Sequence, residues 1–241
     1  MTSPLADVVS RSTSIVFFGG AGVSTESGIP DFRSADGLYN QDLGLSIAPE
    51  EILSHSFFMK HTGQFYDYYK TNIVHSEARP NTAHLALAQL EREGKMSAVI
   101  TQNIDGLHQM AGSREVIELH GSVHRNYCLT CGRRYGLDVV LEAPSIPKCT
   151  CGGVIRPDVV LYEEPLDETV IARAVRALSR ADTLIVGGTS LVVYPAAGLI
   201  DLFHGSDLVL INKEPTPADD RATLVIHDAI GKALAEFLPA H

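Results

Sequence analysis

Residues 14–34 read SIVFFGGAGVSTESGIPDFRS, and this stretch sets the expectation for the fold. Its apolar run ends in Gly20-Ala21-Gly22, a pattern typical of a buried strand that leads into a phosphate-binding turn. Such a turn brings backbone N–H groups close to a diphosphate, and the N-terminus of a following helix adds positive charge. Thr25 stands where the dinucleotide fingerprint has its third glycine. The alternative is a tight turn that serves packing alone.

The tail of this stretch departs from a plain dinucleotide-binding unit. Ser24 and Thr25 could donate further hydrogen bonds to a ligand, whereas Pro30 should stop any helix that starts at Ser24. We therefore expect Asp31-Phe32-Arg33 to lie in a loop over the bound ligand. In that loop Arg33 would suit a phosphate, and Phe32 would shield a reactive carbon from water.

Further apolar runs along the chain read as buried strands, because they are rich in Val and Ile and do not alternate with polar residues. They are Ala98–Thr101, Thr183–Gly188, Leu208–Asn212 and Thr223–Asp228. Helical patterns lie between or after them, at Asn81–Glu93, Glu168–Ser179 and Gly231–Leu238. Strands that alternate with helices predict an α/β fold with a doubly wound parallel sheet.

Two stretches interrupt this alternation. Residues 35–80 are rich in Phe, Tyr and His and contain helical fragments, and residues 127–156 hold all four cysteines. We expect them to form a helical module and a zinc-ribbon module, which together make a small domain. The sheet domain would then comprise residues 1–34, 81–126 and 157–241. A cleft between two such parts is a usual place for a ligand.

The cysteines form two close pairs, Cys128 with Cys131 and Cys149 with Cys151. Two pairs at this separation, each in a glycine-containing turn, predict a tetrahedral zinc site with four sulfur ligands. The second pair is one residue shorter than the usual C-x-x-C. Disulfides are the alternative, but no secretion signal supports them. With four sulfur ligands no open position remains for water, so the zinc would be structural.

The charge balance bears on partners and location. The formal net charge is −10, from 29 acidic and 19 basic residues, which argues against nucleic-acid binding and favours basic partner segments. Acidity that serves only solubility is the alternative. No apolar run approaches the roughly 18 residues of a membrane span, and the first residues carry no secretory signal pattern. We expect a cytoplasmic monomer that does not bind membranes.

Polar residues follow several of the expected strands. Gly188-Thr189-Ser190 follows one, Asn212 ends another, and Gln102, Asn103 and Asp105 follow a third. A buried polar cluster is costly unless it binds something, and Asn212 could hydrogen-bond ribose hydroxyls. These strand ends together predict a nucleotide at this edge of the sheet.

His120 precedes Gly121 just before the cysteine-rich stretch, where an imidazole could take a proton near neutral pH. Taken alone, its position favours a structural role over a catalytic one.

In combination, these segments resemble the sirtuin family of NAD-dependent protein lysine deacylases, and most nearly the bacterial sirtuins of the undifferentiated class. The matching segments occur in the family's order over residues 19–228, nearly the whole chain. They are GAGVSTESGIPDFRS (20–34), TQNIDGLH (101–108), LHGSVHRNYC (119–128), the four cysteines, RPDVVLYEE (156–164), GTSLVVYPAAG (188–198) and IN (211–212).

The resemblance implies a Rossmann-type NAD-binding domain with a small zinc module, and a reaction that removes acetyl groups from protein lysine side chains. NAD would be the co-substrate, and nicotinamide, O-acetyl-ADP-ribose and free lysine the products. The segment through Arg33 would be the family's flexible cofactor loop, which makes a third glycine unnecessary.

The resemblance also implies roles for single residues. His120 would be the general base, with Asn103 and Asp105 as further catalytic residues at the nicotinamide. Phe32 would cover the ribose C1′ after nicotinamide leaves, and Val159, Val160 and Leu161 would lie along the peptide. The implied NAD contacts are Gly20, Ala21, Gly22, Thr25, Phe32, Arg33, Gln102, Asn103, Ile104, Asp105, His120, Gly188, Thr189, Ser190, Asn212, Asp228 and Ala229.

The acyl preference is read from a Tyr-x-x-Arg pair in sirtuins that remove succinyl or malonyl groups. Tyr66 is present here, but Tyr69 stands at the arginine position, and a phenol does not replace a guanidinium opposite a carboxylate. We therefore expect acetyl-lysine as substrate, with longer neutral acyl chains as an alternative, unless the two tyrosines only pack. ADP-ribosyl transfer and a non-catalytic NAD-sensing module are the rival functions.

Overall fold

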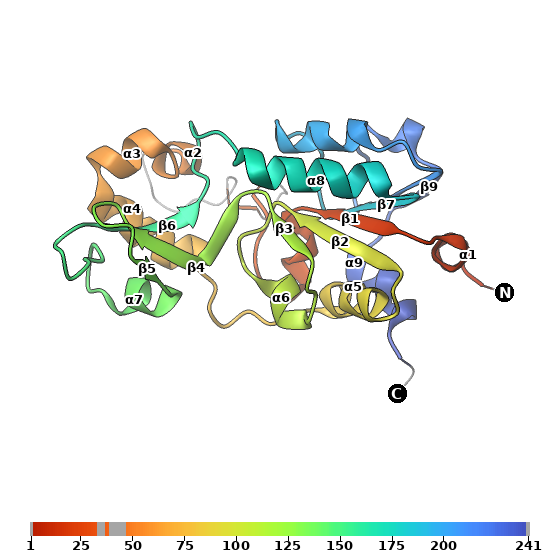
Figure 1. The fold of residues 1–241 in the computed structure, drawn as a ribbon, viewed down its shortest axis with the longest axis horizontal. Coiled ribbons are helices and arrows are strands. Elements are labelled where there is room, and N and C mark those ends of the chain that lie inside the picture. Colours follow the sequence, from red (N-terminus) through yellow and green to blue (C-terminus); the bar gives the residue numbers. More distant parts are fainter. Residues whose placement is uncertain (1, 33–36, 39–46, 240–241) are drawn as a thin grey trace.

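The computed structural model describes residues 2–32, 37–38 and 47–239, and its centre is a six-stranded parallel sheet (Figure 1). The strands are β1 (Ile15–Gly19), β2 (Met96–Thr101), β3 (Val116–Glu118), β7 (Thr183–Gly187), β8 (Asp207–Ile211) and β9 (Leu224–Ile226). Their order is β3-β2-β1-β7-β8-β9, so the chain starts at the centre and winds outward in both directions. This is the Rossmann order, and it confirms the expected fold class.

Alternate residues of β1 face opposite sides of the sheet. Ile15 and Phe17 pack with α1 (Pro4–Arg11), α5 (Thr82–Arg92) and α9 (Ile230–Leu234). Val16 and Phe18 pack with α8 (Glu168–Arg180) and the 3-10 helix η4 (Ala196–Leu202). Figure 1 shows α8 on one face of the sheet and α5 with α9 on the other. All four of these β1 side chains are fully buried, which stabilises the fold by about 1.5–3 kcal/mol each.

The two longest helices of the sheet domain, α5 and α8, begin at polar caps. Asn81 accepts hydrogen bonds from the N–H groups of Ala83 and His84, and Asp167 caps α8 in the same way. The helix expected over 231–238 begins at Ile230 and ends as a 3-10 turn, η6 (Ala235–Phe237). Among the described residues, no helix combines the length and the apolar character that crossing a bilayer requires.

Helix α1 and strand β3 are among the elements of the sheet domain that the sequence analysis did not predict. Helix α1 has a clear signal, because Ser3 caps it and Pro4 occupies its first position. Strand β3 has little signal, because it is a three-residue edge strand that ends in Glu118.

The prediction of a helix directly after the glycine turn is wrong. Two 3-10 turns stand in its place, η1 (Ala21–Val23) and η2 (Thr25–Ser27), and Gly28 closes the second with a left-handed φ of 82°. Pro30 follows too soon for an α-helix to form. No helix N-terminus therefore supplies positive charge at this turn, and the N–H groups of Gly20 and Gly22 already donate to the carbonyls of Gly187 and Gly188. Arg33 lies outside the described residues.

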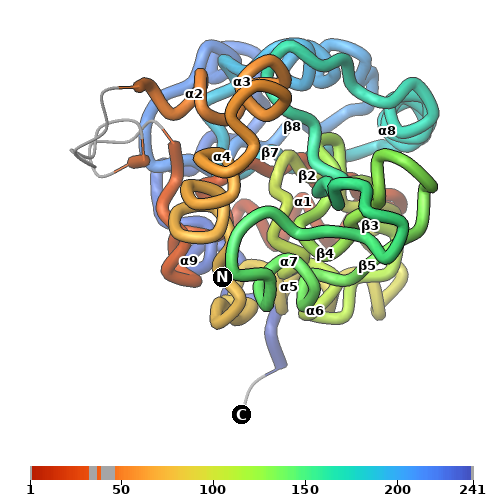
Figure 2. The backbone as a smooth tube through the Cα atoms, turned by 90° about the vertical axis from the view of Figure 1, so that its left-hand side faces the viewer, coloured from red at the N-terminus to blue at the C-terminus, as the bar shows by residue number. Residues whose placement is uncertain are grey.

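Most of the remaining elements form a second unit at the left-hand end of the molecule in Figure 1, and this end faces the viewer in Figure 2. Its antiparallel sheet has the order β5-β4-β6, with β4 at Gly121–Cys128, β5 at Arg134–Tyr135 and β6 at Ile155–Val159. Its helices are α2 (Pro49–Ile52), α3 (His55–Lys60), α4 (Thr62–Tyr68), the π-helix η3 (Tyr69–Ile73) and α7 (Leu137–Glu142). The short helices α6 (Leu107–Ala111) and η5 (Asp219–Arg221) belong to connections of the large sheet.

The two inserted stretches share one core. Phe58, Phe65 and Tyr66 of the helical stretch pack with Val123 of β4 and Val140 of α7. The small sheet also contains residues on both sides of the boundaries expected at 126/127 and 156/157, because β4 begins at residue 121 and β6 ends at residue 159. The division into domains itself stays a prediction.

Gly121 tests the junction between β4 and β6. Its φ is 79°, and a Cβ atom there would lie 2.0 Å from the carbonyl oxygen of Asp158. We expect Gly121→Ala to lower the free energy of unfolding by about 2–4 kcal/mol, because strain and overlap add. Urea unfolding followed by circular dichroism measures this change.

Gly94→Ala is the matched control, since Gly94 has a φ of 73° but nothing within 4 Å of an added Cβ. It should cost only about 1 kcal/mol. Equal losses in the two variants would contradict the close contact at Gly121.

Candidate functional site

The glycine turns after β1 and β7 meet where the strand order reverses. The N–H of Gly22 donates to the carbonyl of Gly188 at 2.8 Å, and a Cβ on Gly22 would lie 2.8 Å from that same oxygen. Gly188 has a φ of 59°, and a Cβ there would lie 2.4 Å from the nitrogen of Val23. Both positions therefore require glycine. In open parallel sheets this crevice at the carboxyl ends of the strands is where ligands bind.

Ser24 connects the turn after β1 to the segment after β2. Its hydroxyl donates to Oδ2 of Asp105 at 2.6 Å and accepts from Nδ2 of Asn103 at 3.0 Å. Oδ1 of Asp105 accepts the N–H of Leu107 at 2.9 Å, and the N–H of Asn103 donates to Thr101. Ser24 is 1% exposed, so this cluster holds an amide and a carboxylate in a fixed arrangement.

His120 is oriented by the same segment. Its Nδ1 lies 2.8 Å from the carbonyl oxygen of Gln102. A carbonyl only accepts, so Nδ1 carries the hydrogen and Nε2 of the neutral ring keeps its lone pair. Burial lowers the pKa of His120 below its ordinary value of 6.5, although the hydrogen bond to Gln102 opposes this shift. The imidazole is therefore neutral near pH 7 and able to take a proton at Nε2.

The other predicted NAD contacts lie along the same edge of the sheet. Nε2 of Gln102 donates to Oγ1 of Thr189 at 3.3 Å, which joins the segments after β2 and β7. At the end of β8, Asn212 donates through Nδ2 to the carbonyl of Glu214. Past β9, Asp228 accepts the N–H of Ala229 at 2.8 Å and pairs with Lys232.

These contacts form a connected series along the strand ends. The N–H of Gly188 donates to Ile211, and the N–H of Asn212 donates to Ile226. The predicted residues after β1, β2, β7, β8 and β9 therefore share one edge of the sheet.

Sequence reasoning missed two buried histidines beside this cluster. The rings of His84 and His108 lie 4.7 Å apart, and burial lowers the pKa of His84 to about 4, which the charge of Asp105 partly offsets. Burial and the neighbouring His84 lower the pKa of His108 well below its usual range. Both rings are therefore neutral. Each is the last residue of a motif that was interpreted for other reasons: His84 ends NTAH at the α5 cap, and His108 ends NIDGLH after β2.

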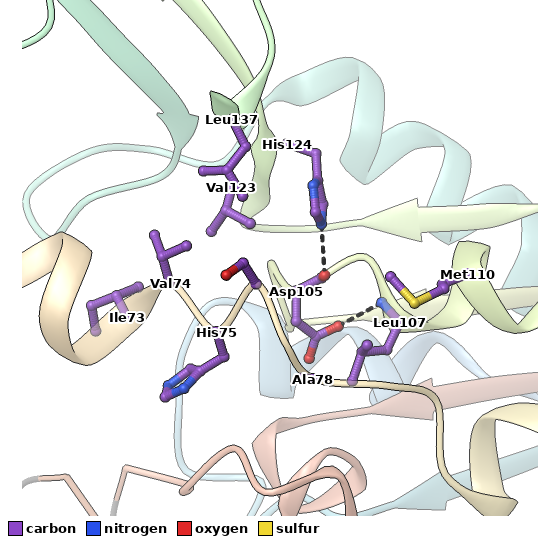
Figure 3. Close-up of a pocket in the computed structure, with 11 residues that line it drawn as sticks. Ile73, Val74, His75, Ala78, Asp105, Leu107, Met110, Val123, His124 and Leu137 are labelled. Atoms are coloured by element: carbon purple, nitrogen blue, oxygen red, sulfur yellow. Dashed lines mark hydrogen bonds between the residues drawn. The ribbon is translucent and has the colours of Figure 1, made fainter. Parts of the chain in front are cut away.

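Figure 3 shows the cavity behind Asp105. Nε2 of His124 lies 2.9 Å from the carbonyl of Asp105, while apolar side chains such as Val74, Val123 and Leu137 form the opposite wall. Its volume of about 20 Å³ holds roughly one water molecule. A larger cleft of about 560 Å³ lies beside β6, lined by residues that include Val159, Val160 and Glu163.

The predicted peptide segment runs past His120. The N–H of Val160 donates to the carbonyl of His120 at 3.0 Å, and the N–H of Leu161 donates to Glu164. The carbonyl of Val159 accepts from Arg156. These backbone groups are occupied within the chain, so pairing of a peptide strand with this segment would have to use others or displace them.

Tyr66 and Tyr69 lie inside the small unit. They are 0% and 1% exposed, and the hydroxyl of Tyr66 donates to the carbonyl of Ile155. Burial is the main cause of the raised pKa of both phenols. Lys70 donates to the carbonyls of Ala143 and Ser145, and its Nζ lies 5.9 Å from the centroid of the Tyr66 ring. This burial favours the packing alternative over contact with an acyl chain.

The four cysteines converge as the spacing predicts. Their sulfur atoms all lie within 4.8 Å of one another, with 3.5 Å between Cys128 and Cys151 and 3.6 Å between Cys131 and Cys149. Zinc–sulfur bonds of ~2.3 Å in a tetrahedron place the sulfurs about 3.8 Å apart, so the residues fit a zinc ion. The hydroxyl of Tyr135 donates to Sγ of Cys149 at 3.0 Å, as a thiolate ligand requires of its surroundings.

Comparison with known proteins finds relatives along the whole chain. The sequence profile of the Sir2 family matches residues 20–195. A Clostridium perfringens protein named NAD-dependent protein deacetylase is 59% identical over 236 residues, covering 97% of this chain and 97% of that protein.

Two solved structures are similar over nearly their full length. One, described as Sir2–p53 peptide–NAD+, is 42% identical with a TM-score of 0.85 and covers 98% of this chain and 97% of its own. Another, a Sir2 protein with deacetylated p53 peptide and 3′-O-acetyl ADP ribose, is 41% identical with a TM-score of 0.86 and covers 95% and 93%.

Metal content tests the cysteine site. We expect inductively coupled plasma mass spectrometry to find about one zinc ion per chain in the purified protein. Cys131→Ala should lose the metal and lower the melting temperature by at least about 5 °C, because metal binding contributes directly to folding. Leu129→Ala, which changes an exposed side chain in the same turn, should keep both the zinc and the stability. Unchanged melting of a metal-free Cys131→Ala protein would contradict a structural zinc.

Proposed function

The chain belongs to the Sir2 family, the sirtuins, and on this premise we propose that it is an NAD-dependent protein-lysine deacetylase. The observation that carries the proposal is the orientation of His120, whose Nδ1 donates to Gln102 beside the Ser24–Asn103–Asp105 cluster. Similar Sir2 proteins bind NAD and a p53 peptide, or the deacetylated peptide with 3′-O-acetyl ADP ribose.

The reaction joins NAD, acetyl-lysine and water and yields nicotinamide, O-acetyl-ADP-ribose and lysine. The acyl oxygen displaces nicotinamide from the ribose C1′, so positive charge develops on the sugar. The carboxylate of Asp105 is held by Ser24 and by the N–H of Leu107, which suits it to bind the nicotinamide carboxamide or to stabilise that charge. Asn103 is held by the same hydroxyl and would act beside it.

His120 is the proposed general base. Its free Nε2 would take a proton from a ribose hydroxyl, so that the ribose oxygen can attack the acyl carbon. The hydrogen bond from Nδ1 to Gln102 stabilises the imidazolium that forms. General-base assistance of this kind contributes about 10²–10⁴-fold to the rate.

The proposed NAD site combines the turn residues with the strand ends. Gly20–Gly22 and Thr25 would face the diphosphate, and Gly188–Ser190, Asn212 and Asp228-Ala229 would contact the ribose and the adenine. Phe32 would cover C1′. The glycines support this assignment, because their lack of Cβ leaves the backbone of the two turns in direct contact.

Acetyl-lysine is the proposed substrate. Tyr66 and Tyr69 are buried, and Lys70 is bonded to backbone carbonyls, so none of these three offers a cation to a succinyl or malonyl carboxylate. The tyrosines would shape the unit without touching the acyl chain. We further propose a cytoplasmic monomer that acts on proteins and binds neither nucleic acid nor membranes. The net charge of −10 supports the part of this proposal that concerns nucleic acid.

Nicotinamide release tests the activity. With NAD and an acetyl-lysine peptide, we expect release that requires both and a matching loss of acetyl groups from the peptide. His120→Ala should lower the rate by about 10²–10⁴-fold. His204→Ala, which changes an exposed histidine outside the site, should retain it. Release without peptide, or ADP-ribose on a protein acceptor with His120→Ala still active, would point instead to ADP-ribosyl transfer.

The pH profile tests the state of His120. Because burial lowers the pKa of the free imidazole, the neutral base persists below pH 6.5 and is lost only as the pH falls through the lowered value. The acidic limb of kcat/KM against pH should therefore have its midpoint below 6.5. A midpoint above 6.5 would argue against a buried His120 as the base.

A further inference from the structure

Glu163 adopts a backbone conformation that side chains rarely tolerate. Its φ is 76°, and among the described residues only Leu191 is another non-glycine with positive φ. Such strain persists where the surroundings hold the residue in place, and it clusters at functional positions. Glu163 comes two residues after Leu161, the end of the proposed peptide segment. The contacts of its side chain show what holds it.

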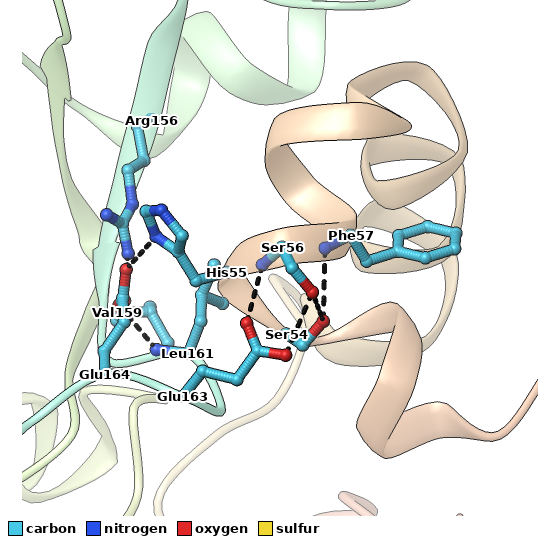
Figure 4. A network of polar contacts seen from close by, with 9 residues as sticks. All are labelled: Ser54, His55, Ser56, Phe57, Arg156, Val159, Leu161, Glu163 and Glu164. Carbon is cyan, nitrogen blue, oxygen red and sulfur yellow. Dashed lines mark hydrogen bonds and ion pairs between the residues drawn. The ribbon is translucent and has the colours of Figure 1, made fainter.

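The carboxylate of Glu163 accepts hydrogen bonds from the first turn of α3 (Figure 4). Oε2 accepts the N–H of Ser56 and Oε1 accepts its hydroxyl, both at 2.9 Å. The first N–H groups of a helix have no partner within the helix, so a carboxylate is favoured there. The neighbouring Tyr162 adds two backbone bonds, from its N–H to Leu53 and from the N–H of His55 to its carbonyl.

The residues that precede Glu163 bond to His120 and to the ion pair of Arg156 and Glu164. The N–H of Val160 donates to the carbonyl of His120, while Glu164 accepts the N–H of Leu161 at 2.9 Å and pairs with Arg156 at 2.5 Å. Within residues 159–163, the first three residues therefore bond to His120 or to the Arg156–Glu164 pair, and the last two bond to residues 53–56. The segment is a bridge between the proposed base and the helical part of the small unit.

We propose that Glu163 is a positioning residue that sets the place of residues 159–163 for the acetyl-lysine peptide, which rests on the proposed deacetylase function. The side chain holds the backbone at positive φ by its two bonds to Ser56. Without these bonds the backbone relaxes, and the segment shifts relative to His120. Peptide affinity then falls, while NAD, which lies at the other strand ends, is bound as before.

Three substitutions separate the effect of the two hydrogen bonds to Ser56, called the clamp below, from the effect of the strained backbone at residue 163. Glu163→Gln keeps an oxygen for the N–H of Ser56 and an amide donor for its hydroxyl, so it keeps both clamp and strain. Glu163→Ala keeps the strain and removes the clamp. Glu163→Gly removes both, because glycine adopts positive φ freely. Glu115→Ala is the control, since Glu115 forms an ion pair with Arg173 at 2.6 Å outside this segment.

Steady-state nicotinamide release measures KM for an acetyl-lysine peptide, KM for NAD and kcat, and thermal melting gives stability. We expect Glu163→Gln and Glu115→Ala to stay within about twofold of the unmodified protein. Glu163→Ala and Glu163→Gly should raise the peptide KM by about three- to tenfold, with the NAD KM and kcat within about twofold. Glu163→Gly should melt above Glu163→Ala, because it relieves the strain.

The outcomes separate this proposal from the function on which it rests. An unmodified protein that releases no nicotinamide with peptide would overturn the deacetylase function, and the role of Glu163 with it. An active protein whose Glu163→Ala variant keeps the original peptide KM would overturn the positioning role alone. Parallel changes in the peptide KM and the NAD KM would also overturn it, because they indicate general loss of structure. Should Glu163→Ala fail to fold, Glu163→Gly still tests the clamp.

Discussion

The hydrogen bond from Nδ1 of His120 to the carbonyl of Gln102 is the contact on which the proposed chemistry depends. It selects the tautomer that leaves Nε2 free, and it ties the base to the segment that carries Asn103 and Asp105. The N–H of Gln102 in turn donates to Gly19 at the end of β1. The parallel sheet makes this convergence possible, because the carboxyl ends of β1, β2 and β7 lie side by side. A base, a carboxylate and two glycine turns therefore meet at neighbouring strand ends.

Local patterns explain which parts of the fold were predictable. Runs of Val, Ile and Phe identify the buried strands in the sequence. The cysteine pairs were predictable because they lie in short turns whose geometry depends on few residues. The failures have local reasons too: β3 is short and ends in a charge, and Pro30 with Gly28 prevents the helix expected after the first turn. The shared core of the small unit needed the structure, because the buried aromatic side chains of residues 57–69 contact β4 and α7 far along the chain.

The candidate site was predictable as a set of residues more than as a network. Ser24 stands in the quoted stretch, but its bond to Asp105 spans 81 residues and leaves no trace in spacing. The burial of Tyr66, Tyr69, His84 and His108 is likewise a result of tertiary packing. The small unit contributes to the geometry around His120. It carries the four cysteines, and through residues 159–163 it bonds to the carbonyl of His120. Its stability therefore bears on the geometry of the base.

Nuclear magnetic resonance of ¹⁵N-histidine-labelled protein observes the central contact directly, with His120→Gln used to assign the signal. We predict that the neutral His120 ring carries its hydrogen on Nδ1 near pH 7, and that Nε2 is protonated only below its ordinary pKa of 6.5. A ring that carries its hydrogen on Nε2, or one that is already an imidazolium near pH 7, would contradict the account.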